Sequence, residues 1–203
     1  MAASGTYSVM ADERADASVF QRASVDPEEF HVIVDRYLPL IHRYLHRRAG
    51  QQLADELTPE VFEVAFARRT TCRFSHGSAL PWLYGIASRL LLRHWRTETR
   101  QLRAYARTGA DVGLVVSDDG AVEERLDADR EGPSLAAGLA ALPRKQREAL
   151  WLYAVADLSY DEVAVALDVP IGTVRTWLHR ARETIRPYLT PRSPGGVPSE
   201  TRS

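Results

Sequence analysis

Apolar residues recur at intervals of three and four along most of this chain, which is the spacing of one face of an α-helix. The first clear helix begins at Asp26-Pro27, a pair suited to a helix start, and Glu29 completes a capping box. Its apolar positions are Phe30, Ile33, Tyr37, Ile41 and Tyr44. Pro39 interrupts this pattern at a point where the helix can kink, and Gly50 is suited to end the helix.

Two further helices follow in the first half of the chain. One is predicted over roughly residues 54–69, where Pro59 marks either a fresh helix start or a kink. A loop over residues 70–77 comes next. The third helix begins after Ser78, which can cap it, and Pro81 fits its first turn. Its apolar positions are interleaved with arginines: Arg89, Arg93, Arg96, Arg100 and Arg103.

The helical pattern resumes near residue 134 and predicts a helix-turn-helix. A capping box at Ser159 and Glu162 starts a short helix, and Asp168-Val169-Pro170 turns the chain into a last helix over residues 171–188. The backbone at the first turn position tends toward positive φ, which aspartate tolerates better than most residues. A short helix, a tight turn and a longer helix are the parts of this motif.

Charge divides the chain into blocks that match these patterns. Basic side chains concentrate within residues 30–107, and acidic ones within residues 108–133. A basic block indicates either a polyanion partner or a solvated charged surface. We therefore predict an all-α fold with two small helical domains joined by a flexible acidic linker. The predicted segments are a disordered tail (1–25), a first domain (26–107), the linker (108–133), a second domain (134–190) and a disordered tail (191–203).

Composition excludes several classes of protein. No apolar run is long enough to span a bilayer and no secretory signal is visible, so we expect a cytoplasmic protein without membrane insertion. A single cysteine, Cys72, excludes an internal disulfide framework. His42 and His46 lack an acid at metal-ligand spacing, and there is no Gly-rich phosphate loop. We expect no metal, no cofactor and no catalytic residue, and hence no enzyme.

The last helix carries a polar and basic face suited to DNA. Arginine and threonine side chains at helical spacing fit base edges and phosphates in the major groove. The alternative is a basic, solvated helix in an ordinary helical hairpin. The candidate residues are Thr173, Arg175, Thr176, His179, Arg180 and Arg182.

Longer stretches resemble a known family. The segment PRKQREALWLYAVADLSYDEVAVALDVPIGTVRTWLHRARETI resembles region 4 of the bacterial sigma-70 family. The segments ADELTPEVFEVAF and GSALPWLYGIASRLLLRHWR resemble region 2. Nothing between them resembles region 3, which matches the extracytoplasmic-function (ECF) group of sigma factors. The resemblance covers about residues 30–189.

This resemblance implies a transcription initiation factor. Such a protein binds core RNA polymerase through the β′ coiled coil and the β flap, and directs it to promoter DNA. Region 2 would read and open the −10 element, region 4 would read the −35 element, and an anti-sigma factor is a further partner. The recognition-helix candidates would then contact the −35 element. The implied −10 residues are Arg73, Phe74, His76, Arg89, Arg93, Trp95 and Arg96, and the implied polymerase-docking acids are Asp55, Glu56 and Glu60.

Other interpretations of these residues stay open at this stage. The docking acids also suit a helix N-terminus, where the macrodipole favours negative charge. The loop residues could be surface residues without a role, and Trp95 could pack in the core. A DNA-binding regulator that acts without polymerase is the main rival function, although no dimer interface or sensor domain is evident. A binding-only module, such as an inhibitor of polymerase, would not need the basic recognition face.

Overall fold

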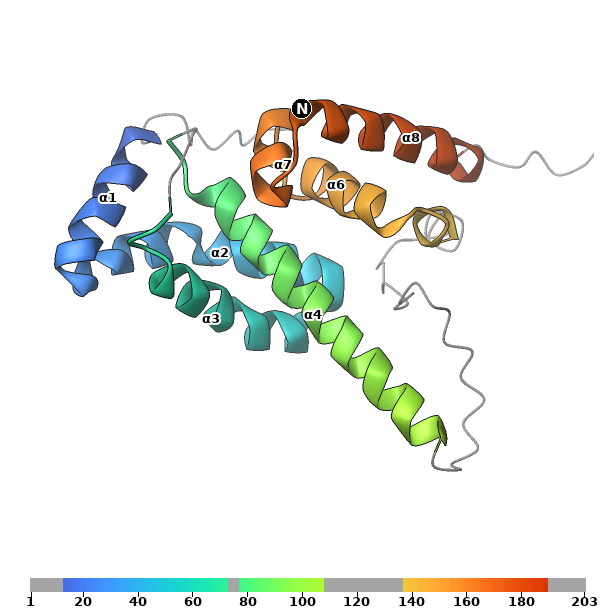
Figure 1. The fold of residues 1–203 in the computed structure, drawn as a ribbon, viewed down its shortest axis with the longest axis horizontal. Helices are drawn as coiled ribbons and strands as arrows, with labels where there is room; N and C mark the ends of the chain where they lie inside the picture. Colours follow the sequence, from blue (N-terminus) through green and yellow to red (C-terminus); the bar gives the residue numbers. More distant parts are fainter. Residues whose placement is uncertain (1–12, 73–76, 108–136, 190–203) are drawn as a thin grey trace, which may run out of the picture.

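The computed structural model describes residues 13–72, 77–107 and 137–189, and every regular element within them is a helix (Figure 1). The predicted all-α fold is therefore confirmed for this part of the chain. The predicted linker over residues 108–133 and the predicted tail over residues 191–203 lie outside it. The elements are α1 (Glu13–Val25), η2 (Pro27–Phe30), α2 (His31–Ala49), α3 (Gln51–Ala67), α4 (Leu80–Arg107), α6 (Arg144–Ala154), α7 (Tyr160–Leu167) and α8 (Ile171–Leu189).

The N-terminal helix α1 corrects the predicted disordered tail (1–25) over residues 13–25, whereas residues 1–12 lie outside the described residues. Val19, Phe20 and Ala23 of α1 are buried. The ring of Phe20 packs edge-on against Phe30 and Trp82, with centroids 5.6 and 5.8 Å apart. The apolar stripe of this helix is short, and its first inward position is a polar residue, so the periodicity of the sequence did not reveal it.

The start of the second helix also differs from the prediction. Asp26 does cap this start, because its carboxylate accepts a hydrogen bond from the Glu28 N–H at 3.1 Å, but the first turn is the 3-10 helix η2. The predicted capping box at Glu29 is wrong, because the Glu29 carboxylate pairs with Arg22 at 2.9 Å. Pro39 lies inside the continuous helix α2.

Gly50 separates α2 from α3, as predicted. Its φ of +85° is a conformation that favours glycine, so the chain turns there with little strain. Helix α3 then runs without a break through Pro59, which excludes a fresh helix start at that residue. It begins at Gln51, three residues before the predicted start.

Helix α4 begins as expected and is the longest helix described. The Ser78 hydroxyl accepts a hydrogen bond from the Leu80 N–H at 3.2 Å, which caps the helix. The first half of α4 packs against α2 and α3, where Leu83, Ile86 and Leu91 are buried. Its second half runs away from the body of the molecule (Figure 1).

The predicted helix-turn-helix is confirmed in its local detail. The Ser159 hydroxyl and the Glu162 carboxylate form both hydrogen bonds of the capping box. Asp168 adopts the left-handed conformation, with φ 55° and ψ 53°. Helix α8 continues through Pro187 to Leu189, one residue beyond the predicted end.

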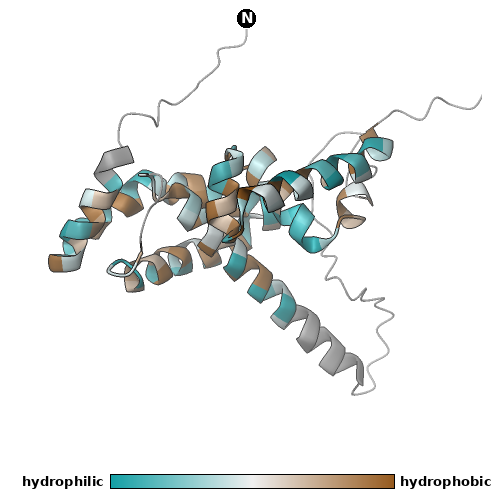
Figure 2. Ribbon diagram, turned by 45° about the horizontal axis from the view of Figure 1, so that its top comes forward, coloured by the Kyte–Doolittle hydropathy of each residue, from teal (hydrophilic) through white to brown (hydrophobic). Residues whose placement is uncertain are grey.

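The two halves of the chain share one hydrophobic core. Helix α7 packs against α4, and a single cluster of buried residues extends from α1 to α8. Figure 2 shows apolar residues gathered where these helices meet. The two halves approach closely at Gly85, where a Cβ atom would lie 2.3 Å from the carbonyl oxygen of Ala166. Glycine is required there because the two helix backbones nearly touch.

A buried ion pair also joins the two halves. Arg48 of α2 donates to both carboxylate oxygens of Glu148 of α6, at 2.8 and 2.7 Å, and both side chains are almost completely buried. Arg48 also donates to the Tyr44 hydroxyl, which is hydrogen-bonded to Ser88 at 2.8 Å. Burial lowers the pKa of a guanidinium, but Tyr44 and Glu148 outweigh that effect and raise the pKa of Arg48. Arg48 therefore stays charged inside the interface.

Candidate nucleic-acid interface

Helix α8 presents the predicted recognition face to solvent. Arg175, Thr176, His179 and Arg180 are exposed, whereas Val174, Leu178 and Ala181 on the opposite side are buried against α6 and α7. Thr173 is half-buried at the edge of this face. Two helical turns of α8 thus offer basic, imidazole and hydroxyl groups together, which are the groups that read base edges and phosphates.

Arg182 differs from the other recognition-helix candidates. Its guanidinium donates to the Tyr160 hydroxyl at 2.9 Å and lies 5.2 Å from the ring centroid of Tyr153. These two tyrosines belong to α7 and α6 and pack edge-on against each other. Arg182 therefore ties the recognition helix to the rest of the motif. The sequence placed Arg182 among the DNA contacts, because charge and helical spacing do not reveal partners on other helices.

The arginines of α4 are regularly spaced but differ in their contacts. Arg96 is exposed, but Arg93 forms an ion pair with Glu60 of α3. Arg93 and Glu60 had been assigned to different partners, DNA and polymerase. The structure brings these two residues together in one exposed ion pair.

A pocket of about 890 Å³ opens between the two halves of the chain. Arg68, Trp82 and Arg89 line one side of it, and Asp161 and Asp168 line the other. Desolvation in this pocket, followed by the nearby Arg68, lowers the pKa of Arg89. The predicted −10 residue Arg89 therefore faces the helix-turn-helix in this arrangement.

Trp95 is half-buried, and the Arg48 guanidinium lies 5.4 Å from its ring centroid. This tryptophan packs at the edge of the shared core, with part of its ring exposed. The other aromatic candidate, Phe74, falls outside the described residues together with Arg73 and His76.

Cys72 lies just before those residues and is no activated nucleophile. Its thiol donates to the Arg69 carbonyl at 3.3 Å, and burial raises the pKa of the thiol to about 11. A thiol with this pKa is protonated near neutral pH.

The predicted docking acids lie on α3. Asp55 and Glu56 are exposed, and Glu60 is half-buried. The Asp55 carboxylate accepts hydrogen bonds from His42 Nε2 at 2.7 Å and from Gln51 at 2.8 Å, and these bonds lower the pKa of Asp55. Asp55 is therefore ionised near neutral pH and available for a basic partner. The sequence did not single out His42 as the neighbour of this acid.

Two classes of site are absent from the described part of the chain. No group of three or more histidine, cysteine or carboxylate side chains there could hold a metal ion. Among the same residues, no helix is both long enough and apolar enough to cross a membrane.

Comparisons with known proteins match both halves of the chain to one family. Residues 33–101 match the family model for sigma-70 region 2, and residues 134–185 match the model for sigma-70 region 4. The two matches stand in the order that the sequence motifs indicate.

Three curated proteins illustrate the similarity. The ECF RNA polymerase sigma factor SigE of Mycolicibacterium smegmatis is 33% identical over 162 residues, covering 79% of this chain and 62% of SigE. The sigma factor HrpL of Pseudomonas syringae is 32% identical, covering 76% of this chain and 83% of HrpL. SigW of Bacillus subtilis is 27% identical, covering 81% of this chain and 90% of SigW.

Solved structures support the same fold. The sigma factor RpoE of Bartonella quintana, solved with the anti-sigma factor NepR, superimposes with a TM-score of 0.55 at 20% identity. That match covers 80% of this chain and 97% of RpoE. CnrH, solved with the cytosolic domain of CnrY, gives a TM-score of 0.53 at 18% identity, covering 86% of this chain and 96% of CnrH.

Proposed function

Because the chain belongs to the ECF group of the sigma-70 family of RNA polymerase sigma factors, we propose that it binds core polymerase and selects promoters. One observation carries this proposal: regions 2 and 4 occur together, in order, and the second ends in a helix with an exposed basic face. In this role the chain acts in the cytoplasm as an initiation factor and not as an enzyme.

The direct test is assembly with polymerase. The chain is mixed with bacterial core RNA polymerase at low and at moderate salt and then co-purified. Stable association is expected at both salts, followed by run-off transcription from a subset of genomic fragments. Sequence-specific DNA binding without polymerase association would favour the rival function, a stand-alone regulator.

The exposed face of α8 is the proposed reader of the −35 element. Arg175, Thr176, His179 and Arg180 would enter the major groove, with Thr173 at the edge of the contact. Arg182 would hold α8 in position for this contact through its interactions with Tyr160 and Tyr153.

Arg175→Ala and Arg180→Ala are each expected to weaken binding at the −35 element by about 1–3 kcal/mol, because each removes a charged donor from the exposed face. The measurement is holoenzyme binding to promoters that carry either the preferred −35 sequence or single-base changes in it. Arg186→Ala is the matched control, since it removes one arginine from a later turn of the same helix. Equal losses on every DNA sequence would identify phosphate contacts and contradict base readout.

Region 2 is the proposed reader of the −10 element. Arg89, Arg93 and Arg96 would hold promoter phosphates, while Arg73, Phe74, His76 and Trp95 would engage the opened bases. Two of these residues have partners within the chain: Glu60 pairs with Arg93, and Arg48 lies over Trp95. Promoter DNA would compete with Glu60 for Arg93 and with Arg48 for Trp95.

The acids of α3 are the proposed docking site for the β′ coiled coil. Changing Asp55 and Glu56 together to lysine is expected to weaken the affinity for core polymerase at least about tenfold, because complementary charge becomes repulsion. The affinity is measured by titration of labelled chain with core polymerase. Glu63→Lys, a charge reversal at another exposed position of α3, is the control. Undiminished affinity of the double variant would remove these acids from the docking surface.

An anti-sigma factor is the remaining proposed partner. The similar fold of RpoE was solved with an anti-sigma factor, and we expect a comparable protein to bind this chain.

A further inference from the structure

We propose that α1 clamps the two ends of the segment between α3 and α4, and that Asp16 and Arg69 are positioning residues for selection of the −10 element. This inference rests on the proposed function of region 2. Helix α1 precedes residue 33, where the match to sigma-70 region 2 begins, so that match assigns it no role.

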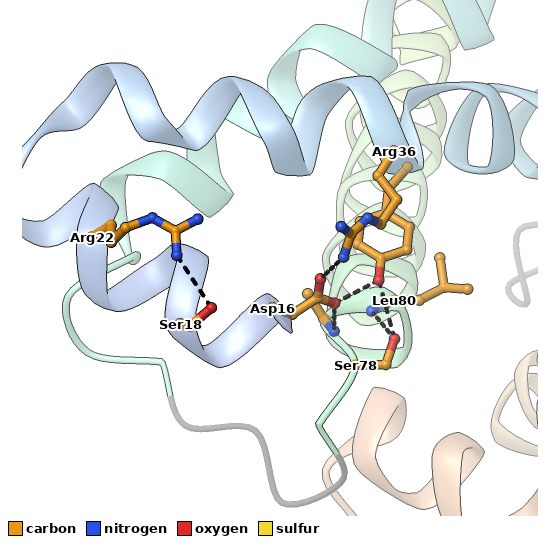
Figure 3. A network of polar contacts seen from close by, with 8 residues as sticks. Asp16, Ser18, Arg22, Arg36, Ser78 and Leu80 are labelled. Atoms are coloured by element: carbon orange, nitrogen blue, oxygen red, sulfur yellow. Dashed lines mark hydrogen bonds and ion pairs between the residues drawn. The ribbon is translucent and has the colours of Figure 1, made fainter. Parts of the chain in front are cut away.

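One end of the clamp is the buried carboxylate of Asp16. Its Oδ2 accepts hydrogen bonds from the Ala79 N–H at 2.7 Å and from the Tyr37 hydroxyl at 2.5 Å. Its Oδ1 accepts from Arg36 Nη1 at 2.5 Å (Figure 3). Burial and the bond to Asp16 raise the pKa of Tyr37 to about 12, so the Tyr37 hydroxyl remains a donor. Asp16 is thereby fixed on three sides.

This carboxylate holds the start of α4. The Ala79 N–H that it binds lies directly before Leu80, the first residue of the helix, where negative charge is favourable. Tyr37 extends the network, because its hydroxyl also lies 3.3 Å from the Ser78 hydroxyl that caps α4. The position of the α4 N-terminus therefore depends on α1.

The other end of the clamp lies at Arg69, beyond the C-terminus of α3. Its Nε donates to the carbonyl of Ala23 in α1 at 2.9 Å, and its Nη1 donates to the Phe66 carbonyl at 2.9 Å. The guanidinium also lies 4.0 Å from the centroid of the Phe66 ring. Arg69 therefore ties the end of α3 to the second half of α1.

Together these bonds let α1 set the separation of two chain ends. Asp16 and Ala23 lie seven residues apart on one helix, which spans about 10 Å at a rise of 1.5 Å per residue. A rigid helix of this length holds Arg69 and Ala79 at a fixed spacing. Reading a base requires groups held within about 0.5 Å of the productive geometry. Loosening either end should therefore reduce discrimination between −10 bases before it reduces polymerase binding.

The test uses the full chain with core RNA polymerase. Holoenzymes carrying wild-type, Asp16→Asn or Arg69→Met chain transcribe a pooled genomic-fragment library, and the transcripts are sequenced to score base preferences at both promoter elements. A wrong −10 base is expected to lower wild-type transcription about tenfold. In either variant that penalty should fall to about threefold, while the −35 penalty and the affinity for core polymerase stay unchanged.

Glu29→Gln is the matched control, because it breaks the exposed ion pair between α1 and η2 but touches neither end of the clamp. Unchanged −10 discrimination in Arg69→Met would overturn the inference even where Asp16→Asn does not fold. A uniform loss of activity with the same −10 preferences would also overturn it, since that is the effect of a merely structural residue. A wild-type chain that directs no transcription would refute the proposed function and this inference with it.

Discussion

Glu148→Ala destabilises the packing between the two halves of the chain by about 3–5 kcal/mol, which is the largest effect we expect from one substitution. The variant leaves the fully buried guanidinium of Arg48 without its counter-charge. That charge regains water only when α6 separates from α2. Two donors at this site, Arg48 Nε and the Trp151 indole N–H, already lack a hydrogen-bond acceptor among the described residues. Loss of the Glu148 carboxylate would therefore add further buried donors without an acceptor.

Urea unfolding and small-angle scattering measure this effect. The variant should unfold at lower urea concentration, and its radius of gyration should increase at concentrations where wild type stays compact. The control replaces both partners, Arg48→Met with Glu148→Met, which removes the charges together and is expected to be nearly neutral. If the single and double variants unfold alike, the ion pair does not govern this packing.

Gly85→Ala is expected to weaken the same interface by about 1–3 kcal/mol through a different mechanism. The new Cβ atom would lie 2.3 Å from the Ala166 carbonyl oxygen, and a backbone atom has little freedom to move aside. Alanine otherwise favours a helix interior over glycine by about 1 kcal/mol, so a net loss reports the clash between α4 and α7. Thermal unfolding of the variant and of wild type shows whether Gly85→Ala lowers or raises the stability of the chain.

Gly172→Ala provides the matched comparison. Gly172 is also helical, but nothing lies within 4 Å of the Cβ atom it would gain. This variant is expected to stabilise the chain by about 0.5–1 kcal/mol. A stabilised Gly85→Ala chain would show that α7 does not press on α4 in solution.

Features that depend on neighbouring residues in the sequence could be predicted. Local backbone chemistry predicts the capping box at Ser159 and Glu162, the left-handed conformation at Asp168 and the end of a helix at Gly50. The structure confirms all three. The exposed face of α8 follows from helical periodicity alone. These signals were sufficient to identify the helix-turn-helix.

Features that depend on distant partners could not be predicted. Arg48 and Glu148 have no periodic relation, and nothing in the sequence distinguishes them from surface residues. The same reason explains Arg182, whose tyrosine partners lie on other helices, and Arg93, whose partner is on α3. Helix α1 was missed because its inward-facing positions include a carboxylate, Asp16, that becomes buried only through tertiary hydrogen bonds.

The ion pair between α2 and α6 also bears on how the length of the chain between them can vary. It joins residues that are 100 positions apart in the sequence. The entropy lost on closing a connection grows only with the logarithm of its length, so ten residues added between α4 and α6 would change the closure free energy by about 0.2 kcal/mol. Insertions and deletions between the two regions therefore leave their packing almost unaffected. Related chains are free to differ in the length of this connection while they keep the same contact.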